Sequence, residues 1–244
     1  MKPTSHGRYV AILSGIFIAF WVVLAIEPYD RADWMLENAH VVAFAIMLVA
    51  SYRRLMLSRI SYLLIFVFLC LHEVGAHYTY AEVPYDRWFE AIIGKTLNGI
   101  LGLERNHFDR LVHFLYGLLL AHPVREIFLR VANVRGFWGY FLPLDLTMSS
   151  SMMFELFEWG AAELVGGDLG MAYLGTQGDV WDAHKDMALA SLGALVAMSV
   201  TAGINFSLQR DFAREWAESL HVKHREPLGE VEIRRMLDER REKE

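Results

Sequence analysis

Residues 9–26 read YVAILSGIFIAFWVVLAI, a run of 18 residues without a charged side chain. An α-helix rises about 1.5 Å per residue, so a run of this length can cross a hydrocarbon core of about 30 Å. A cleaved signal peptide has a shorter apolar core and small residues at its cleavage site. Glu27, Pro28 and Tyr29 follow the run and do not form such a site. The stretch therefore predicts a retained membrane-spanning helix.

The rest of the chain repeats this pattern in long apolar blocks, and 55% of its 244 residues are hydrophobic. Only helices and closed barrels satisfy the backbone inside a bilayer. We therefore predict an all-α, polytopic membrane protein whose first 208 residues form one transmembrane domain. Its six expected spans lie at about 9–26, 38–52, 61–78, 107–122, 137–162 and 181–208.

Charge and cysteine content exclude some other classes of protein. The net charge of −6 is modest and does not indicate a nucleic-acid partner. The single cysteine, Cys70, has no partner for an internal disulfide and lies within an apolar run, so we expect a packing role.

Basic residues predict the orientation of the spans. With the N-terminus in the cytoplasm, most of the 23 Lys and Arg residues fall in inner segments. The outer segments then hold only Arg31, Arg87, Lys95 and Arg105. Cytoplasmic loops of membrane proteins are enriched in Lys and Arg, so we predict that both termini lie in the cytoplasm.

Two helical segments are expected outside the spans. Apolar residues recur at helical spacing over residues 85–103, which predicts an amphipathic helix lying in the outer membrane interface. The tail, residues 209–244, is charged, and Pro227 should divide it into two helical pieces. We expect this tail to be solvated in the cytoplasm and to offer a surface for a partner.

Ionisable side chains gather at the outer ends of the predicted spans. They are His40, His72, Glu73, His77, His107, Asp109, Arg110, His113, Glu155, Glu158, Asp179, Asp182, His184, Lys185 and Asp186. Residues three or four positions apart share a helix face, as Asp109 and His113 do. Ionisable groups at membrane depth are costly unless they pair, line water or bind something. We therefore expect the side chains to meet in one outward-facing polar pocket.

His and carboxylate side chains are the usual ligands of zinc and other first-row divalent metals. The candidate metal ligands are His72, His77, Asp109, His113, Asp182 and Asp186. Glu155 or Glu158 is the candidate general base, and Arg110 the candidate for holding an anionic headgroup. Two alternatives stay open: a metal-free ionic network, or a structural role in which Asp179 and Asp182 cap the last helix.

Four segments of the chain carry a family resemblance. They are HEVGAHYTYAEVPYD (72–86), ERNHFDRLVHF (104–114), FELFEW (154–159) and GTQGDVWDAHKDM (175–187). Through them, residues 10–205 resemble the bacterial inner-membrane family typified by YjdF, whose function is uncharacterised. The resemblance implies a multi-pass protein of the bacterial inner (plasma) membrane. The acidic start of the last span, with Gly193 after it, is also distantly similar to VanZ-like membrane proteins, which implies no reaction.

Three functions remain in competition. The leading hypothesis is a metal-dependent hydrolase or transferase that acts on a lipid or lipid-linked substrate reached past the 85–103 helix. The second is a carrier for a cation or a proton, against which the apolar inner halves of the spans and the lack of a clear repeat argue. The third is a structural or assembly factor that binds its partner through the tail.

Overall fold

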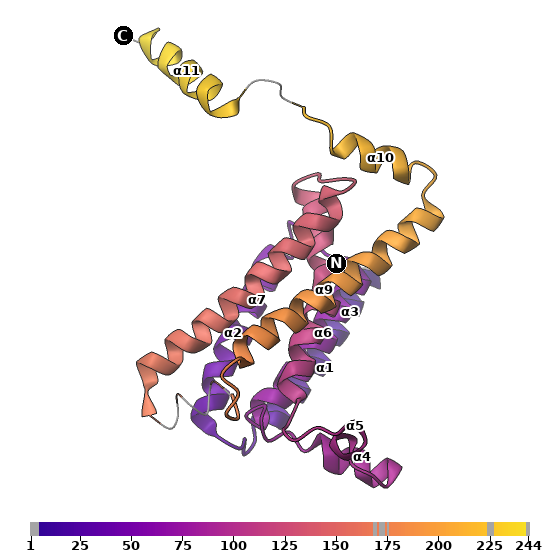
Figure 1. Ribbon diagram of the computed structural model, residues 1–244, viewed down its shortest axis with the longest axis vertical. Coiled ribbons are helices and arrows are strands. Elements are labelled where there is room, and N and C mark those ends of the chain that lie inside the picture. The colour runs from indigo at the N-terminus through magenta and orange to yellow at the C-terminus, as the bar shows by residue number, and fades with distance from the viewer. Residues whose placement is uncertain (1–4, 168–169, 171–173, 175, 224–226, 243–244) are drawn as a thin grey trace.

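The computed structural model describes residues 5–167, 170, 174, 176–223 and 227–242, and the regular elements of this part are helices (Figure 1). Gly175, the first residue of the 175–187 segment, lies outside the described residues. Six long helices lie side by side as a bundle. They are α1 (Ser5–Leu24), α2 (Arg31–Ser51), α3 (Arg59–His77), α6 (Phe108–Val131), α7 (Trp138–Val165) and α9 (Asp182–Leu208). In the bundle α6 packs against α3, α7 and α9, while α1 and α2 pack against α3.

Five of these helices (α1, α2, α3, α6 and α9) are, within the described residues, long and apolar enough to cross a membrane. The sixth, α7, has 28 residues and is long enough, but it is not among them. The acids Asp145, Glu155 and Glu158 are spread along α7 and lower the hydropathy of its central stretch. The prediction of an all-helical membrane protein is therefore confirmed, whereas the count of six spans is not established by composition.

The second helix begins earlier than the sequence predicts, at Arg31 instead of residue 38. The Asp30 side chain caps it by accepting hydrogen bonds from the backbone N–H groups of Ala32 (2.7 Å) and Asp33 (3.0 Å). As a result, Asp33 and Glu37 are helical residues on the bundle and do not belong to an outer loop.

Close packing of α6 on α9 depends on two glycines. A Cβ at Gly117 would overlap the carbonyl oxygen of Ala190, and one at Gly193 would overlap the carbonyl oxygen of Phe114. Small residues let two membrane helices approach until their backbones touch. The first turns of α6 and α9, which carry most of the predicted site residues, are thereby held next to each other.

Hydrogen bonds between helix ends and loops show which of them lie at the same end of the bundle. At one end the Tyr29 N–H donates to the His77 carbonyl (2.9 Å). At the other end the Arg59 guanidinium donates to the Ser5 hydroxyl (2.8 Å), and Glu126 accepts from the Ser58 N–H (2.8 Å). The N-terminal helix therefore starts at the end where α2 passes into α3.

The segment 85–103, predicted as one helix, is two short helices, α4 (Tyr85–Ile93) and α5 (Leu97–Leu101). Gly94 ends α4 with a left-handed backbone (φ 78°), and the Thr96 side chain then caps α5. The prediction of a continuous helix is wrong because Gly94 stops it. Both helices project from the bundle at the end opposite to the tail (Figure 1).

The tail forms α10 (Phe212–Ser219) and α11 (Leu228–Arg241), with Pro227 immediately before α11. The first of these helices rests on the bundle: its Ser219 hydroxyl accepts from the Phe137 N–H (2.9 Å), and Trp216 packs edge-on against Phe137. α11 lies away from the bundle (Figure 1). The tail is thus only partly the solvated extension that its charge predicts.

Candidate functional site

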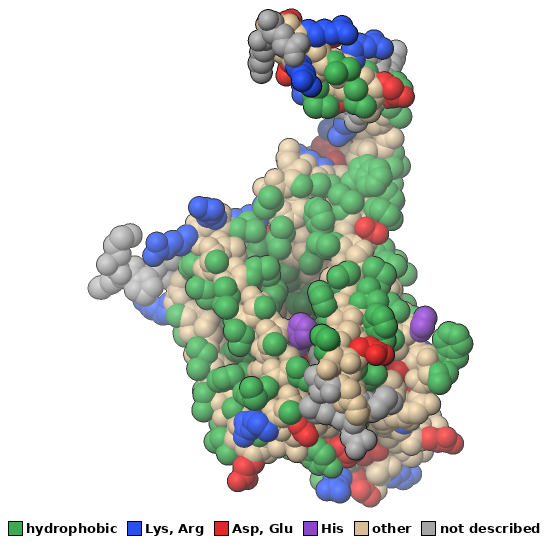
Figure 2. Space-filling model, turned by 90° about the vertical axis from the view of Figure 1, so that its left-hand side faces the viewer, with side chains coloured by type: hydrophobic (Ala, Val, Ile, Leu, Met, Phe, Trp, Pro, Cys, Tyr) green, Lys and Arg blue, Asp and Glu red, His purple; other side chains and the backbone are tan. Residues whose placement is uncertain are grey.

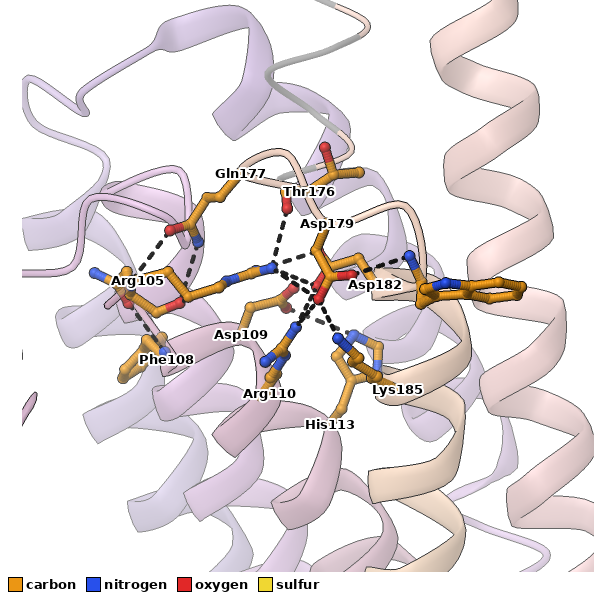
Figure 3. A network of polar contacts seen from close by, with 12 residues as sticks. Arg105, Phe108, Asp109, Arg110, His113, Thr176, Gln177, Asp179, Asp182 and Lys185 are labelled. Atoms are coloured by element: carbon orange, nitrogen blue, oxygen red, sulfur yellow. Dashed lines mark hydrogen bonds and ion pairs between the residues drawn. The ribbon is translucent and has the colours of Figure 1, made fainter. Parts of the chain in front are cut away.

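Two arginines tie the start of α9 to the segment around the start of α6 (Figure 3). Arg105 bonds both carboxylate oxygens of Asp182, at 2.7 and 3.2 Å. Arg110 bonds Asp179 (2.5 Å) and Asp182 (3.1 Å), and Lys185 bonds the same Asp179 oxygen (2.5 Å). Asp182 is 3% exposed and fully engaged by guanidinium groups. It is therefore placed as an ion-pair partner, and the structure does not bring it to the metal-ligand group.

The same region is reinforced by backbone contacts. Arg105 also donates to the Thr176 carbonyl (3.0 Å), and Asn106 and Gln177 exchange two hydrogen bonds, each 3.1 Å long. Arg105 is not among the predicted site residues, because the sequence places it in an outer loop. The available signal was its position directly before the first turn of the fourth span.

Asp179 sits where positive charge converges. The hydrogen bond from Lys185, followed by those from the Trp181 N–H and from Arg110, holds the pKa of the Asp179 carboxyl well below its usual range. Asp179 therefore stays ionised over the physiological pH range. Its permanent negative charge binds Arg110 of α6 and Lys185 of α9.

A second layer lies deeper in the bundle and contains three of the predicted metal ligands. One ligand atom from each of Asp109, His113 and Asp186 lies within 4.8 Å of the other two. The Nε2 atom of His113 is 3.5 Å from Asp109 Oδ1 and 3.5 Å from Glu155 Oε1. Metal–ligand distances in zinc sites are about 2 Å, so this spacing is close to what one ion requires. The Asp186 Oδ1 and Glu155 Oε1 atoms are buried and make no hydrogen bond.

A pocket of about 690 Å³ adjoins these residues between α6, α7 and α9. Its polar side includes Asp109, Glu155, Glu158, Asp182 and Asp186, and its apolar side includes Met152, Leu156, Trp159, Val180 and Met187. Leu156 and Trp159 are also exposed on the outside of α7. Figure 2 views the molecule from the side on which α7 lies in Figure 1, and shows acidic and histidine side chains among a mostly hydrophobic surface. The pocket therefore reaches an apolar face, and no residue of α4 or α5 lines it.

Two predicted ligands lie apart from this group. His77 places its Nδ1 atom 2.8 Å from the Leu24 carbonyl, where it joins the end of α3 to the end of α1. His72 is buried, with Nδ1 2.5 Å from the Tyr80 hydroxyl and Nε2 3.9 Å from Glu37 Oε2. Neither histidine belongs to the Asp109–His113–Asp186 group.

A set of buried acids on α2 is not among the predicted site residues. Asp33 and Glu37 are each 2% exposed, and they share one helix face because they are four residues apart. The predicted second span starts at residue 38, which leaves both acids in a loop, whereas α2 starts at Arg31. Burial, together with the nearby charges of Glu37 and Asp109, raises the pKa of the Tyr80 hydroxyl well above its usual value. Tyr80 therefore stays protonated next to these acids.

The region holds more buried acid than base. Among the described residues, no Lys or Arg forms an ion pair with the remaining carboxylates of this region, which are Asp33, Glu37, Glu73, Asp109, Glu155, Glu158 and Asp186. Buried carboxylates are stable only when they are protonated, hydrogen-bonded or neutralised by a cation. These acids therefore require protons, hydrogen bonds or a bound cation.

Comparison with known proteins gives two matches. Residues 9–205 match a family described as predicted membrane protein (DUF2238). The chain is 38% identical to the inner membrane protein YjdF of Escherichia coli K12 over 192 residues, which cover 78% of this chain and 88% of YjdF. No solved structure matches the chain. The family match ends at residue 205, so α10 and α11 lie beyond it.

Proposed function

Because the chain belongs to the DUF2238 family of predicted membrane proteins, we propose a function that is carried out on a substrate within the bilayer. The resemblance inferred from the four sequence segments is confirmed by the family match and by YjdF. The protein is an integral, multi-pass protein of the inner membrane. Its reaction is inferred from the site.

The proposed topology has six spans, with α7 as the sixth and both termini in the cytoplasm. An even number of spans is supported by contacts at one end of the bundle. There Arg59 bonds Ser5 of α1, and the Gly136 N–H bonds Glu215 of α10 (3.2 Å). Ser5 and α10 lie at the end where Arg53, Arg54, Arg59 and Arg130 gather, and cytoplasmic ends are rich in arginine.

The proposed activity is metal-dependent hydrolysis or group transfer on a lipid or lipid-linked substrate. The observation that carries it is the Asp109–His113–Asp186 group, placed beside a pocket that reaches an apolar face. Two carboxylates and an imidazole suit zinc or another first-row divalent metal. Such an ion polarises a carbonyl or phosphoryl oxygen and lowers the pKa of bound water.

The remaining residues of the pocket have separate proposed roles. Glu155, whose Oε1 atom lies 3.5 Å from His113 Nε2, would accept a proton from an attacking water. The apolar wall, which includes Leu156 and Trp159, would receive the hydrocarbon part of the substrate. Arg110, the candidate for holding an anionic headgroup, is already paired with Asp179 and Asp182. We propose that it positions α9 on α6.

An assay with lipids tests this proposal. The full-length protein is purified in detergent and loaded with Zn²⁺ or Mn²⁺. It is then incubated with bacterial polar lipids and with a polyprenyl diphosphate, and products are identified by mass spectrometry. We expect turnover that a chelator abolishes and that Glu155→Gln reduces about 100-fold or more. The matched control is Glu163→Gln, since Glu163 is an exposed carboxylate of the same helix. Lack of turnover by the folded, metal-loaded protein across both lipid classes would contradict the proposal.

A carrier function is the second candidate, because polar side chains continue below the site. The Tyr116 hydroxyl lies 2.6 Å from the Ser150 hydroxyl, and Thr147 and Ser151 are buried between the helices. Chains of this kind can conduct ions or protons. Flux of Mn²⁺ or protons into sealed vesicles that is lost in Tyr116→Phe would favour this alternative.

A further inference from the structure

Arg125, near the end of α6, carries a half-buried guanidinium group without an ionic partner. Its Nε atom is buried and makes no hydrogen bond, and the group forms no ion pair with any residue that the structure describes. The guanidinium carbon lies over the Tyr140 ring, 4.6 Å from its centre. A guanidinium stacked on an aromatic ring keeps the N–H groups at its edge available for a ligand. Arg125 therefore offers a positive charge and hydrogen-bond donors that the chain itself does not use.

The charge of Arg125 is not offset by the neighbouring acid. Glu126 accepts hydrogen bonds from the Ser61 hydroxyl (2.6 Å) and from Arg130 (2.9 Å), so its carboxylate is engaged elsewhere. Arg125 also lies one helical turn beyond Ala121, which is fully buried between α6 and α9. A charge that is partly removed from water and has no partner destabilises a protein. An anion from outside the chain would offset this cost.

Aromatic side chains place Arg125 at the depth of a membrane interface. The Trp138 indole of α7 donates to the Ser219 carbonyl of α10 (2.9 Å), and the Trp216 ring lies 5.7 Å from the Tyr140 ring. Trp and Tyr are enriched at the level of lipid headgroups. This end of the bundle lies opposite to α4 and α5 (Figure 1), and the proposed topology assigns it to the cytoplasm. Arg125 thus lies at the level of lipid phosphates.

We propose that Arg125 binds the phosphate of an anionic phospholipid, such as phosphatidylglycerol, from the cytoplasmic leaflet. Guanidinium and phosphate form charge-assisted hydrogen bonds that are often bidentate. Basic pockets between membrane helices on the cytoplasmic side bind anionic headgroups. A zwitterionic lipid already neutralises its own phosphate, so it offsets the charge of Arg125 less well. The site lies at the opposite end of α6 from Asp109 and His113, and the inference does not depend on the proposed reaction.

Two exposed arginines add positive charge at the same end of the bundle. Glu215 accepts hydrogen bonds from the Gly136 N–H (3.2 Å) and from the Gln209 side chain (2.6 Å), which joins the loop before α7 to the segment before α10. The residues next to these donors, Arg135 and Arg210, are exposed. Their charges attract an anionic headgroup to this surface. The stacked guanidinium then fixes its position.

The test measures lipid binding to the full-length protein, purified and delipidated in an uncharged detergent, by native mass spectrometry. Phosphatidylglycerol, phosphatidylethanolamine and inorganic phosphate are titrated separately. We expect the wild type to bind one phosphatidylglycerol at least about tenfold more tightly than either of the others. Arg125→Gln should lose this preference, and Arg125→Lys should keep part of it, because lysine retains the charge but not the planar fork. The matched control is Arg54→Gln, which removes an exposed arginine from the same end and should bind like the wild type.

Melting temperatures separate lipid binding from a structural role of Arg125. Phosphatidylglycerol should raise the melting temperature of the wild type and of Arg54→Gln, but not that of Arg125→Gln. Without lipid, Arg125→Gln should melt about as high as the wild type, because the substitution removes a charge that has no partner. If that variant does not fold, the lipid preference of the wild type and its reduction in Arg125→Lys decide the question.

Two results overturn the proposal. One is equal affinity of the wild type and its folded Arg125 variants for phosphatidylglycerol. The other is wild-type binding of phosphatidylethanolamine or inorganic phosphate as tight as that of phosphatidylglycerol. The metal content of Arg125→Gln should equal that of the wild type, so failure of this lipid site leaves the proposed function standing.

Discussion

Arg105 bonds both oxygens of Asp182 across 77 residues of sequence, at 2.7 and 3.2 Å. The pair joins the loop before α6 to the first turn of α9, and the Asp182 side chain is almost fully buried. A buried ion pair contributes to stability only when its hydrogen-bond geometry is good, and removal of one partner leaves an uncompensated buried charge. Asp182 is therefore occupied by arginine, whereas Asp186 of the same helix has a carboxylate oxygen without a hydrogen bond.

Arg105→Ala should therefore destabilise the bundle. We expect a loss of about 2–3 kcal/mol, at the low end for a buried pair because Arg110 still contacts Asp182. The loss is measured by denaturant unfolding in detergent micelles. Arg105→Ala combined with Asp182→Ala should cost less than the sum of the single changes. Additive losses would show that the pair contributes no coupling.

Gly117→Val should separate α6 from α9, because its side chain would meet the backbone of Ala190 and Ala194. Overpacking of this kind costs about 1–3 kcal/mol or more. The matched control is Gly203→Val, since nothing lies within 4 Å of a Cβ at that position of α9. Melting temperatures of the two variants in the same detergent check the prediction. An equal effect at both glycines would contradict the close approach of α6 and α9.

Much of the bundle could be predicted from the sequence because apolar length reports directly on membrane-spanning helices. The start of α2 could not be predicted, because acidic residues before an apolar run are typical of a loop. Asp30 provides the cap, and it makes Asp33 and Glu37 part of the bundle. Gly94 similarly divided a periodic pattern that reads as one helix.

The candidate site was predicted in part for a related reason. Spacing along one helix placed Asp109 with His113 and marked Asp186 on the facing helix. Spacing along a helix cannot distinguish a carboxylate that is paired with an arginine from one that is not. Asp182 and Asp186 share a helix face, yet a distant arginine engages the first and leaves the second unpaired.

The contribution of Asp179 to stability should depend on pH in a defined direction. Its pKa is lowered in the folded protein, so the stabilisation is present above the ordinary pKa and is lost only as the pH falls through the lower folded value. The difference in melting temperature between the wild type and Asp179→Asn should therefore stay constant from about pH 8 to pH 5 and shrink below about pH 4. A difference that disappears near pH 6 would contradict the assignment.

Cysteine labelling tests the orientation of the bundle. In a Cys70→Ser background, Glu104→Cys lies in an exposed segment beside the candidate site, and Arg54→Cys lies in an exposed segment at the other end. A maleimide that does not cross the inner membrane should label Glu104→Cys in cells whose outer membrane has been made permeable. It should label Arg54→Cys only after lysis. The opposite pattern would reverse the topology and place the site in the cytoplasm.

The most direct measurement is the metal content of the purified full-length protein, determined by elemental analysis beside three single variants. We predict about one zinc or other first-row divalent ion per chain in the wild type. His113→Ala and Asp186→Asn should lose that ion, whereas Asp182→Asn should keep it because Asp182 is committed to Arg105 and Arg110. A folded wild type without metal, or metal retained equally in His113→Ala and Asp186→Asn, would contradict the proposed metal centre.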